Sequence, residues 1–170
     1  MKTAIILGAS GLIGGHALNL LLADNRYEKV ICIGRKPLEI ENEKLEQQTG
    51  DLFEMESFKS AFQESTDLFV AIGTTRAKTP DKTLYKKIDL GIPVAAAKLA
   101  ETYGIKNIAV VSSMGADSKS RVFYTSLKGK MEDVFVALNT ENVNIVRPSL
   151  LLGDRKEDRT GEGIGAFLMT

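Results

Sequence analysis

The sequence predicts an α/β fold in which helices cover both faces of a parallel β-sheet. Apolar runs of strand length recur at regular intervals, and segments with the apolar period of a helix lie between them. The apolar runs are continuous rather than alternating, which is typical of strands that are buried on both faces. Strands and helices in regular alternation therefore indicate a doubly wound parallel sheet.

Composition favours a single globular domain. The chain has 170 residues, 44% apolar and 26% charged, and its 22 basic and 22 acidic residues give a formal net charge of zero. This length suits one domain, and the balanced charge lacks the basic excess of proteins that bind nucleic acid or anionic membranes. No apolar run approaches the length of a membrane span. We expect one domain over residues 1–170 with a small-molecule substrate and no nucleic-acid or membrane partner. The helix surfaces of such a fold also offer room for a homodimer.

The scarcity of cysteine and histidine narrows the chemistry. Cys32 is the single cysteine and lies in an apolar run, so it forms no internal disulfide and serves as a small hydrophobe. The first apolar run is too short for a signal-peptide core. Both features favour a reducing, cytoplasmic location. One His and one Cys exclude a thiolate or imidazole metal cluster, so we expect no metal.

The elements are expected in a fixed order. Strands are predicted over residues 3–7, 30–33, 68–72, 108–111 and 143–146, with a weaker one over 45–49. Helices are predicted over residues 12–23, around 58–62, over 89–103 and over 124–138. Pro93, inside the third helix, either kinks it or marks its true first turn. In the first helix one broad face collects Leu12, Ile13, Ala17, Leu20 and Leu21.

The first strand runs into a glycine-rich turn that favours dinucleotide binding. Its glycines follow a Gly-x-x-Gly-x-x-Gly spacing between a predicted strand and a predicted helix. Such glycines allow a tight turn, a backbone close to a pyrophosphate and close packing of helix on strand. The N–H groups at the start of the helix would then face the phosphates. The alternative is a merely structural turn. The segment reads Gly8-Ala9-Ser10-Gly11-Leu12-Ile13-Gly14.

The turn after the second strand bears on which dinucleotide is bound. An NAD site needs an Asp or Glu there for the ribose hydroxyls, whereas the 2′-phosphate of NADP needs cations. The chain has Gly34-Arg35-Lys36 and no acid. Arg35 as a bidentate partner and Lys36 as a point charge favour NADP, with NAD as the second choice. The alternative is that both are solvated turn residues.

Two further strand ends complete the expected cofactor set. After the third strand, Asp51 of Asp51-Leu52 either contacts the adenine edge or caps the next helix. After the fourth strand, Gly73-Thr74 lets the backbone pass the ribose and pyrophosphate at the switch point of the sheet. A basic run follows, which faces an acidic substrate or the phosphates, or more simply forms a solvated helix face. The run comprises Arg76, Lys78, Lys82, Lys86 and Lys87.

The fifth strand and the helix after it carry a candidate catalytic trio. The strand ends at Ser112-Ser113, and the helix opens with Tyr124 and Lys128, which share one helix face at i and i+4. A phenol with a pKa of about 10 needs a neighbouring cation to favour its phenolate, and Lys128 supplies one. A serine hydroxyl can hold a carbonyl substrate in line with a hydride donor.

These motifs resemble those of the short-chain dehydrogenases/reductases of the extended or atypical kind. Five segments are similar in sequence to the Tat-interacting-protein-like oxidoreductases within that group. They are the glycine turn, Gly73 to Arg76, Ser112 to Asp117, Tyr124 to Lys128 and Arg147 to Leu152. The resemblance implies an NAD(P)-binding Rossmann domain. It also implies roles for the trio: Tyr124 as the acid–base, Lys128 lowering its pKa and touching the nicotinamide ribose, and Ser113 orienting the carbonyl, with Ser112 in reserve.

The chain departs from the family's pattern at one position, and one matching motif has an alternative interpretation. Arg147-Pro148 corresponds to a loop that passes the nicotinamide end, although a proline there also stiffens a sheet exit without any chemistry. The Asn that completes the catalytic set in many relatives has no clear match, and Asp89 stands in the helix after the fourth strand instead. Residues 149–170 look like the start of an incomplete substrate-side segment.

The expected function is hydride transfer between NADP(H) and a small carbonyl compound or alcohol. One alternative is epimerase or dehydratase chemistry of a related kind, which needs a larger substrate domain. Another is a dinucleotide-sensing regulator or assembly protein with little turnover.

Overall fold

Six parallel strands form one sheet with the order β3-β2-β1-β4-β5-β6. The computed structural model describes residues 1–149, so the expected segment beyond Ser149 lies outside the described residues. The strand order reverses between β1 and β4, which is the switch point of a doubly wound sheet. The predicted fold class is confirmed. The strands are β1 (Lys2–Leu7), β2 (Tyr27–Gly34), β3 (Leu45–Thr49), β4 (Asp67–Val70), β5 (Asn107–Val111) and β6 (Asn142–Val146).

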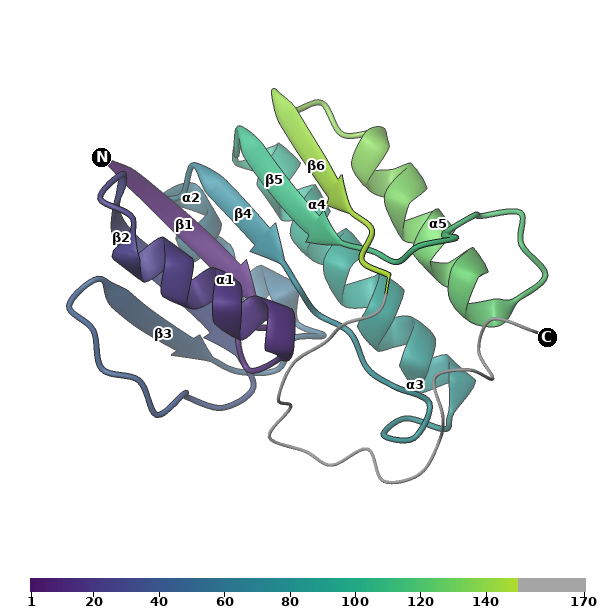
Figure 1. The fold of residues 1–170 in the computed structure, drawn as a ribbon. Helices are drawn as coiled ribbons and strands as arrows, with labels where there is room; N and C mark the ends of the chain where they lie inside the picture. Colours follow the sequence, from purple (N-terminus) through teal and green to yellow (C-terminus); the bar gives the residue numbers. More distant parts are fainter. Residues whose placement is uncertain (150–170) are drawn as a thin grey trace.

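Helices lie on both faces of the sheet, as Figure 1 shows. One face packs against α1, and the other packs against α2, α4 and α5, so the apolar core divides into two clusters. Residues of β1 alternate between them: Ile5 and Leu7 belong to the larger cluster, and Ala4 and Ile6 belong to the smaller one. The helices are α1 (Leu12–Ala23), α2 (Lys59–Gln63), α3 (Lys82–Lys86), α4 (Ile92–Thr102) and α5 (Phe123–Val136), with a 3₁₀ turn at Met55–Phe58 and a π-helical turn, η2, at Lys87–Gly91.

The buried face of α1 differs from the expected one. Leu18 and Leu21 are buried on the sheet together with Gly14, whereas Leu20 is 72% exposed. A Cβ on Gly14 would lie 2.1 Å from the carbonyl oxygen of Gly8, directly after β1, so the helix turns its Gly14-Leu18-Leu21 stripe inward. Leu20, which the helical period groups with Leu21, therefore lies outside the buried stripe.

The sixth strand also differs from a strand buried on both faces. In β6 only Val143 and Ile145 pack against the larger core cluster, and the other three residues are exposed. Within residues 1–149, β6 is an edge strand with a single neighbour, β5. Its alternating burial follows from that position.

Pro93 stands at the start of α4, directly after the π-helical turn. Proline has no N–H group, so it cannot donate to the carbonyl four residues back, which belongs to Asp89. The chain meets this constraint by widening into the π turn at Lys87–Gly91 before α4 begins. Pro93 thus lies in a first turn, and the helical path before it is irregular.

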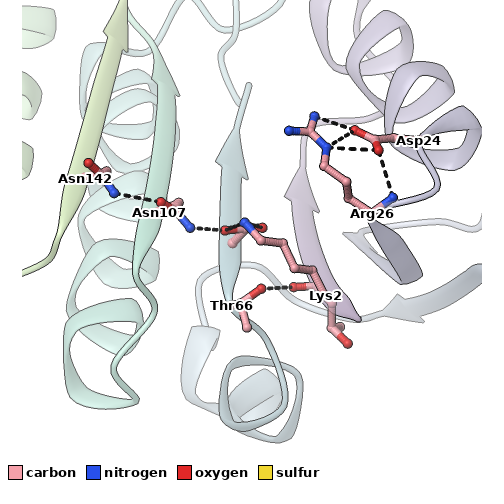
Figure 2. Close-up of polar contacts among 8 residues, drawn as sticks. Lys2, Asp24, Arg26, Thr66, Asn107 and Asn142 are labelled. Atoms are coloured by element: carbon pink, nitrogen blue, oxygen red, sulfur yellow. Dashed lines mark hydrogen bonds and ion pairs between the residues drawn. The ribbon is translucent and has the colours of Figure 1, made fainter.

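A ladder of polar side chains ties together the amino ends of four strands (Figure 2). Asp67, which begins β4 and is 1% exposed, pairs with Lys2 Nζ of β1 at 3.2 Å. Asn107 Nδ2 of β5 donates to the other oxygen of Asp67, and Asn142 Nδ2 of β6 donates to Asn107 Oδ1 at 2.9 Å. This ladder lies at the edge of the sheet opposite the carboxyl ends of the strands.

Candidate functional site

The carboxyl ends of the parallel strands bring the sequence-predicted site residues to one edge of the sheet. In the strand register, Leu7 pairs with Ile33 of β2 and with Val70 of β4, so the segments that follow these residues are neighbours. Val110 of β5 lies beside Val70 in the same way. The glycine turn, the Arg35-Lys36 turn, the Gly73-Thr74 segment and the two serines therefore share this edge.

Gly8 and Gly14 hold the turn and α1 tightly together. Gly8 has a φ of +88°, and a Cβ there would lie 2.5 Å from the carbonyl oxygen of Ala71. A Cβ on Gly14 would lie 2.1 Å from the carbonyl oxygen of Gly8. Only glycine satisfies both close approaches, one between strands β1 and β4 and one between helix and strand.

Gly11 has a different environment from these two glycines. A Cβ at Gly11 would meet a single atom within 4 Å, the carbonyl oxygen of Gly8 at 3.3 Å, and the residue is exposed. It is the N-cap of α1 and brings no side-chain cap to the helix. The N–H groups at the start of α1 thus face an approach that no Cβ obstructs, beside exposed Ser10 and half-buried Leu12 and Ile13.

The candidate residues after β2 and β3 divide into exposed and buried side chains. Arg35 and Lys36 are exposed and follow the last residue of β2. Asp51 is exposed, and its Oδ1 accepts a hydrogen bond from the backbone N–H of Phe53 at 2.9 Å, which forms a local turn. The side chain of Leu52 belongs to the larger core cluster, so it can meet a ligand only through its backbone.

A buried ion pair connects the Gly73-Thr74 segment to α5. Lys128 Nζ lies 3.3 Å from Asp89 Oδ1, with side chains that are 4% and 1% exposed. Asp89 Oδ2 accepts a hydrogen bond from the Thr74 N–H at 2.8 Å, and Tyr85 donates from its hydroxyl to the Thr74 carbonyl at 3.1 Å. A Cβ on Gly73 would lie 3.2 Å from Asp89 Oδ1 and 4.0 Å from Lys128 Nζ. The expected cofactor segment and the expected catalytic lysine are therefore in direct proximity.

Ser112 and Ser113 directly follow β5 and have buried hydroxyl groups. Ser113 Oγ has no hydrogen-bond partner among the described residues. Ser112 Oγ has none there at normal hydrogen-bond geometry, although it lies near enough to the Glu132 carboxylate to help lower its pKa. Their backbone is held by the neighbouring strand end, because Ser112 N–H donates to the Val146 carbonyl at 2.8 Å and Met114 N–H donates to the Pro148 carbonyl at 3.1 Å. A buried hydroxyl without a partner is costly, so a group that binds here gains a ready donor or acceptor.

Tyr124 lies in the first turn of α5, one turn before Lys128. The loop that leads to it is tied to the same helix, since Asp117 N–H donates to the Thr125 carbonyl at 3.1 Å. A Cβ on Gly129 would lie 2.1 Å from the backbone nitrogen of Ser118. This contact presses the loop after Ser113 onto α5, close to the turn that carries Tyr124 and Lys128.

Arg147 is bound to a carboxylate of α5. Its Nε donates to Glu132 Oε1 at 2.9 Å, and its Nη2 pairs with Glu132 Oε2. Burial opposes ionisation of Glu132, but the hydrogen bonds and charge of Arg147 lower the pKa of this carboxyl below its ordinary value. The Arg147 guanidinium thus fixes β6 to α5, and Pro148 follows it as a half-buried residue.

The geometry at the carboxyl edge of the sheet suits a bound dinucleotide. Its turn has a glycine whose missing Cβ leaves the helix N-terminus open, which suits a pyrophosphate. Two exposed cations follow β2 on one side of β1. The buried hydroxyls of the two serines follow β5, which lies on the other side of β1 and is separated from it by β4.

Sequence reasoning did not foresee two of the contacts. It noted Asp89 only as a departure, and it did not single out Glu132. Glu132 follows Lys128 by four residues in a helix whose neighbouring positions Met131 and Phe135 are fully buried. A charged residue in such a stripe is the signal that could have revealed a buried pair.

Comparison with known proteins places these features in context. The NAD(P)H-binding family matches residues 8–163. Protein HTATIP2 of Rattus norvegicus is 35% identical over 164 residues, which cover 95% of this chain and 67% of that protein. Protein FMP52, mitochondrial, of Candida glabrata is 35% identical over 173 residues, with 98% and 71% covered.

Solved structures share the fold at low sequence identity. MoeE5 in complex with UDP-glucose and NAD has a TM-score of 0.70 and 18% identity, with 85% of this chain and 53% of that chain covered. The UDP-glucose 4-epimerase of Thermotoga maritima with UDP-glucose has a TM-score of 0.69 and 15% identity, with 85% and 54% covered. The chain thus spans about half the length of these structures. Across residues 1–149, no helix has the length and apolar character to cross a membrane.

Proposed function

Because the chain belongs to the NAD(P)H-binding family, we propose that it is an NADP-dependent oxidoreductase of the short-chain dehydrogenase/reductase type. It would transfer hydride between NADP(H) and a small carbonyl compound or alcohol. The observation that supports the proposal is that two motifs meet at Gly73. A Cβ on Gly73 would lie 4.0 Å from Lys128 Nζ, and a Cβ on Gly8 would lie 2.5 Å from the carbonyl oxygen of Ala71, two residues before Gly73.

The residues would divide the work between binding and proton transfer. The glycine turn and the N-terminus of α1 would bind the pyrophosphate, and Arg35 with Lys36 would bind the 2′-phosphate. Bound nicotinamide supplies or accepts the hydride. In reduction, Tyr124 would donate its phenolic proton to the substrate oxygen, Lys128 would favour the phenolate that remains, and Ser113 Oγ would orient the carbonyl. Ser112 is the reserve for that orienting role.

The cofactor claim is tested by binding. We expect NADPH to bind more tightly than NADH, and Arg35→Ala to remove most of the difference, because the 2′-phosphate then loses its bidentate partner. Lys106→Ala, which removes an exposed cation directly before β5 at the opposite, amino edge of the sheet, serves as a control that keeps the preference. Equal affinities in the unaltered chain would contradict the preference for NADP.

The catalytic claim is tested by turnover. A screen of aldehydes and ketones that follows NADPH oxidation should reveal substrates, and Tyr124→Phe should abolish their turnover while NADPH binding stays nearly intact. Unchanged turnover in Tyr124→Phe would remove this residue from the mechanism. NADPH binding without turnover of any carbonyl would favour the dinucleotide-sensing alternative. We also propose that the protein is located in the cytoplasm, a reducing compartment. Imaging of the tagged chain tests this location.

A further inference from the structure

Asp89 and Lys128 form a buried pair that the proposed reaction does not itself require. The carboxylate comes from the π-helical turn η2 and the ammonium comes from α5, and both side chains are almost fully enclosed. Burial of two charges is expensive unless the pair is well placed and hydrogen-bonded. The Thr74 N–H supplies the additional hydrogen bond to the carboxylate.

The local backbone explains how the carboxylate reaches this place. Pro93 cannot bond the Asp89 carbonyl, and the π turn that results carries Asp89 beneath the Gly73-Thr74 segment. The gap for it exists because Gly73 has no Cβ, which would lie 3.2 Å from the carboxylate. The segment expected to touch the cofactor, the carboxylate and the lysine thus form one continuous contact.

Lys128 lies four residues after Tyr124 on α5, so the charges that surround Lys128 bear on the charge that it presents to that side of the helix. Glu132 on α5 and Arg147, which directly follows β6, pair with each other, so their charges largely cancel. The Thr74 N–H donates to Asp89 Oδ2, and Tyr85 of α3 donates to the carbonyl of the same Thr74. Lys128 therefore enters the site as half of an ion pair and not as an isolated cation.

We propose that Asp89 is a positioning residue for the proposed reaction: it fixes the Lys128 ammonium beside Gly73-Thr74 and offsets its charge, so that the Tyr124 phenol keeps its proton at neutral pH. An isolated lysine would favour the phenolate, which accepts a proton and suits alcohol oxidation. A charge-compensated lysine leaves a protonated phenol, which donates and suits carbonyl reduction. Asp89 would thereby extend carbonyl reduction to higher pH. The inference rests on the proposed function.

The substitution Asp89→Asn removes the negative charge of the side chain and keeps its shape. The amide oxygen can still accept from Thr74 N–H, and the volume is nearly unchanged, but the negative charge is gone. Loss of a full charge close to Lys128 should lower the apparent pKa of Tyr124 by about one, which is a roughly tenfold rise in the phenolate fraction. The pH at which reduction begins to fail should fall by the same amount.

Tyrosinate absorbance measures this directly and needs no substrate. The chain has four tyrosines and no tryptophan, so subtracting the titration of Tyr124→Phe from that of the unaltered protein isolates Tyr124. The same difference is taken in Asp89→Asn and in Lys128→Met backgrounds. Thermal unfolding confirms that each variant is folded at the pH values used.

The outcomes distinguish this inference from the proposed function. A lower Tyr124 midpoint in Asp89→Asn supports the inference, and an unchanged or higher midpoint overturns it. If Lys128→Met also leaves the midpoint unchanged, the coupling of Lys128 to Tyr124 in the proposed function has failed instead. Should Asp89→Asn fold poorly, the titration is repeated on Asp89→Ser, which also removes the charge and leaves a smaller polar side chain. An unchanged or higher Tyr124 midpoint in Asp89→Ser would likewise overturn the inference.

Discussion

Replacing Gly14 by alanine tests the geometry of the glycine turn. The new Cβ would lie 2.1 Å from the Gly8 oxygen, 2.6 Å from the Gly8 carbonyl carbon and 3.0 Å from the Ala9 Cα. All three are backbone atoms, so no side chain can turn away to make room. The start of α1 must withdraw from the end of β1, and the turn between them must change shape.

The cost follows from two opposing effects. Overpacking of a close contact costs about 1–3 kcal/mol, and the backbone clash at Gly14 belongs at the upper end of that range. Alanine in a helix interior returns about 1 kcal/mol relative to glycine. The net loss is about 2 kcal/mol of unfolding free energy, which in a domain of this size lowers Tm by about 4–8 °C.

The adjacent glycines provide matched controls. A Cβ on Gly15 would lie 3.4 Å from the Ala9 oxygen, an ordinary contact, so Gly15→Ala should gain about 0.5–1 kcal/mol from reduced backbone freedom. A Cβ on Gly11 meets only the Gly8 oxygen at 3.3 Å. Gly11→Ala should therefore change Tm little, yet weaken NADPH binding about tenfold because the methyl group stands where the phosphates approach.

Thermal unfolding and NADPH binding, measured on the three glycine variants, test both the packing of the helix and the approach of the phosphates. The reasoning about helix packing is refuted if Gly14→Ala is as stable as Gly15→Ala. The reasoning about the phosphates is refuted if Gly11→Ala binds NADPH as tightly as the unaltered chain.

Three further changes probe other contacts. Gly129→Ala should cost about 2–3 kcal/mol and most of the turnover, because its Cβ would lie 2.1 Å from the Ser118 nitrogen; an unchanged Tm would contradict this. Glu132 has a lowered pKa, so its pairing with Arg147 stabilises the fold above the ordinary value of 4.5 and is lost as pH falls through the lowered pKa. Urea unfolding should show this acid-dependent loss, and Glu132→Gln should lack it; equal pH dependence would argue against the pair. Asp67→Ala should cost about 1–3 kcal/mol in urea unfolding with NADPH affinity unchanged, and a neutral result would mean that the amino-edge ladder adds nothing.

The sequence predicted the fold and the family well because both rest on local patterns. Continuous apolar runs marked the strands, and the spacing from Gly8 to Gly14 marked the turn; the sheet topology and the family comparison confirm these expectations. Spacing along the chain was sufficient there, since a strand, its turn and the following helix are contiguous. The roles assigned to individual site residues stay predictions.

What escaped prediction depends on contacts between distant segments. Leu20 was grouped with Leu21 on one apolar face because the helix period alone does not say which stripe a close contact at Gly14 selects. The pairing of Asp89 with Lys128 joins residues far apart in the sequence and depends on a π turn, which no periodicity indicates. Arg147 was assigned to the cofactor from its motif, and its bond to Glu132 appears only once β6 lies beside α5.

The two edges of the sheet use their polar groups in opposite ways. At the amino edge, Asp67 and Asn107 are bonded to one another and to their neighbours. At the carboxyl edge, the Ser113 hydroxyl finds no partner among residues 1–149, and the Ser112 hydroxyl finds none there at normal hydrogen-bond geometry. A library of single substitutions scored separately for protein abundance and for cofactor-dependent activity should therefore sort by position: changes at the amino edge would lower yield, and changes to the serines would spare yield and lower activity. Such a map would locate the working surface of the molecule without any ligand in hand.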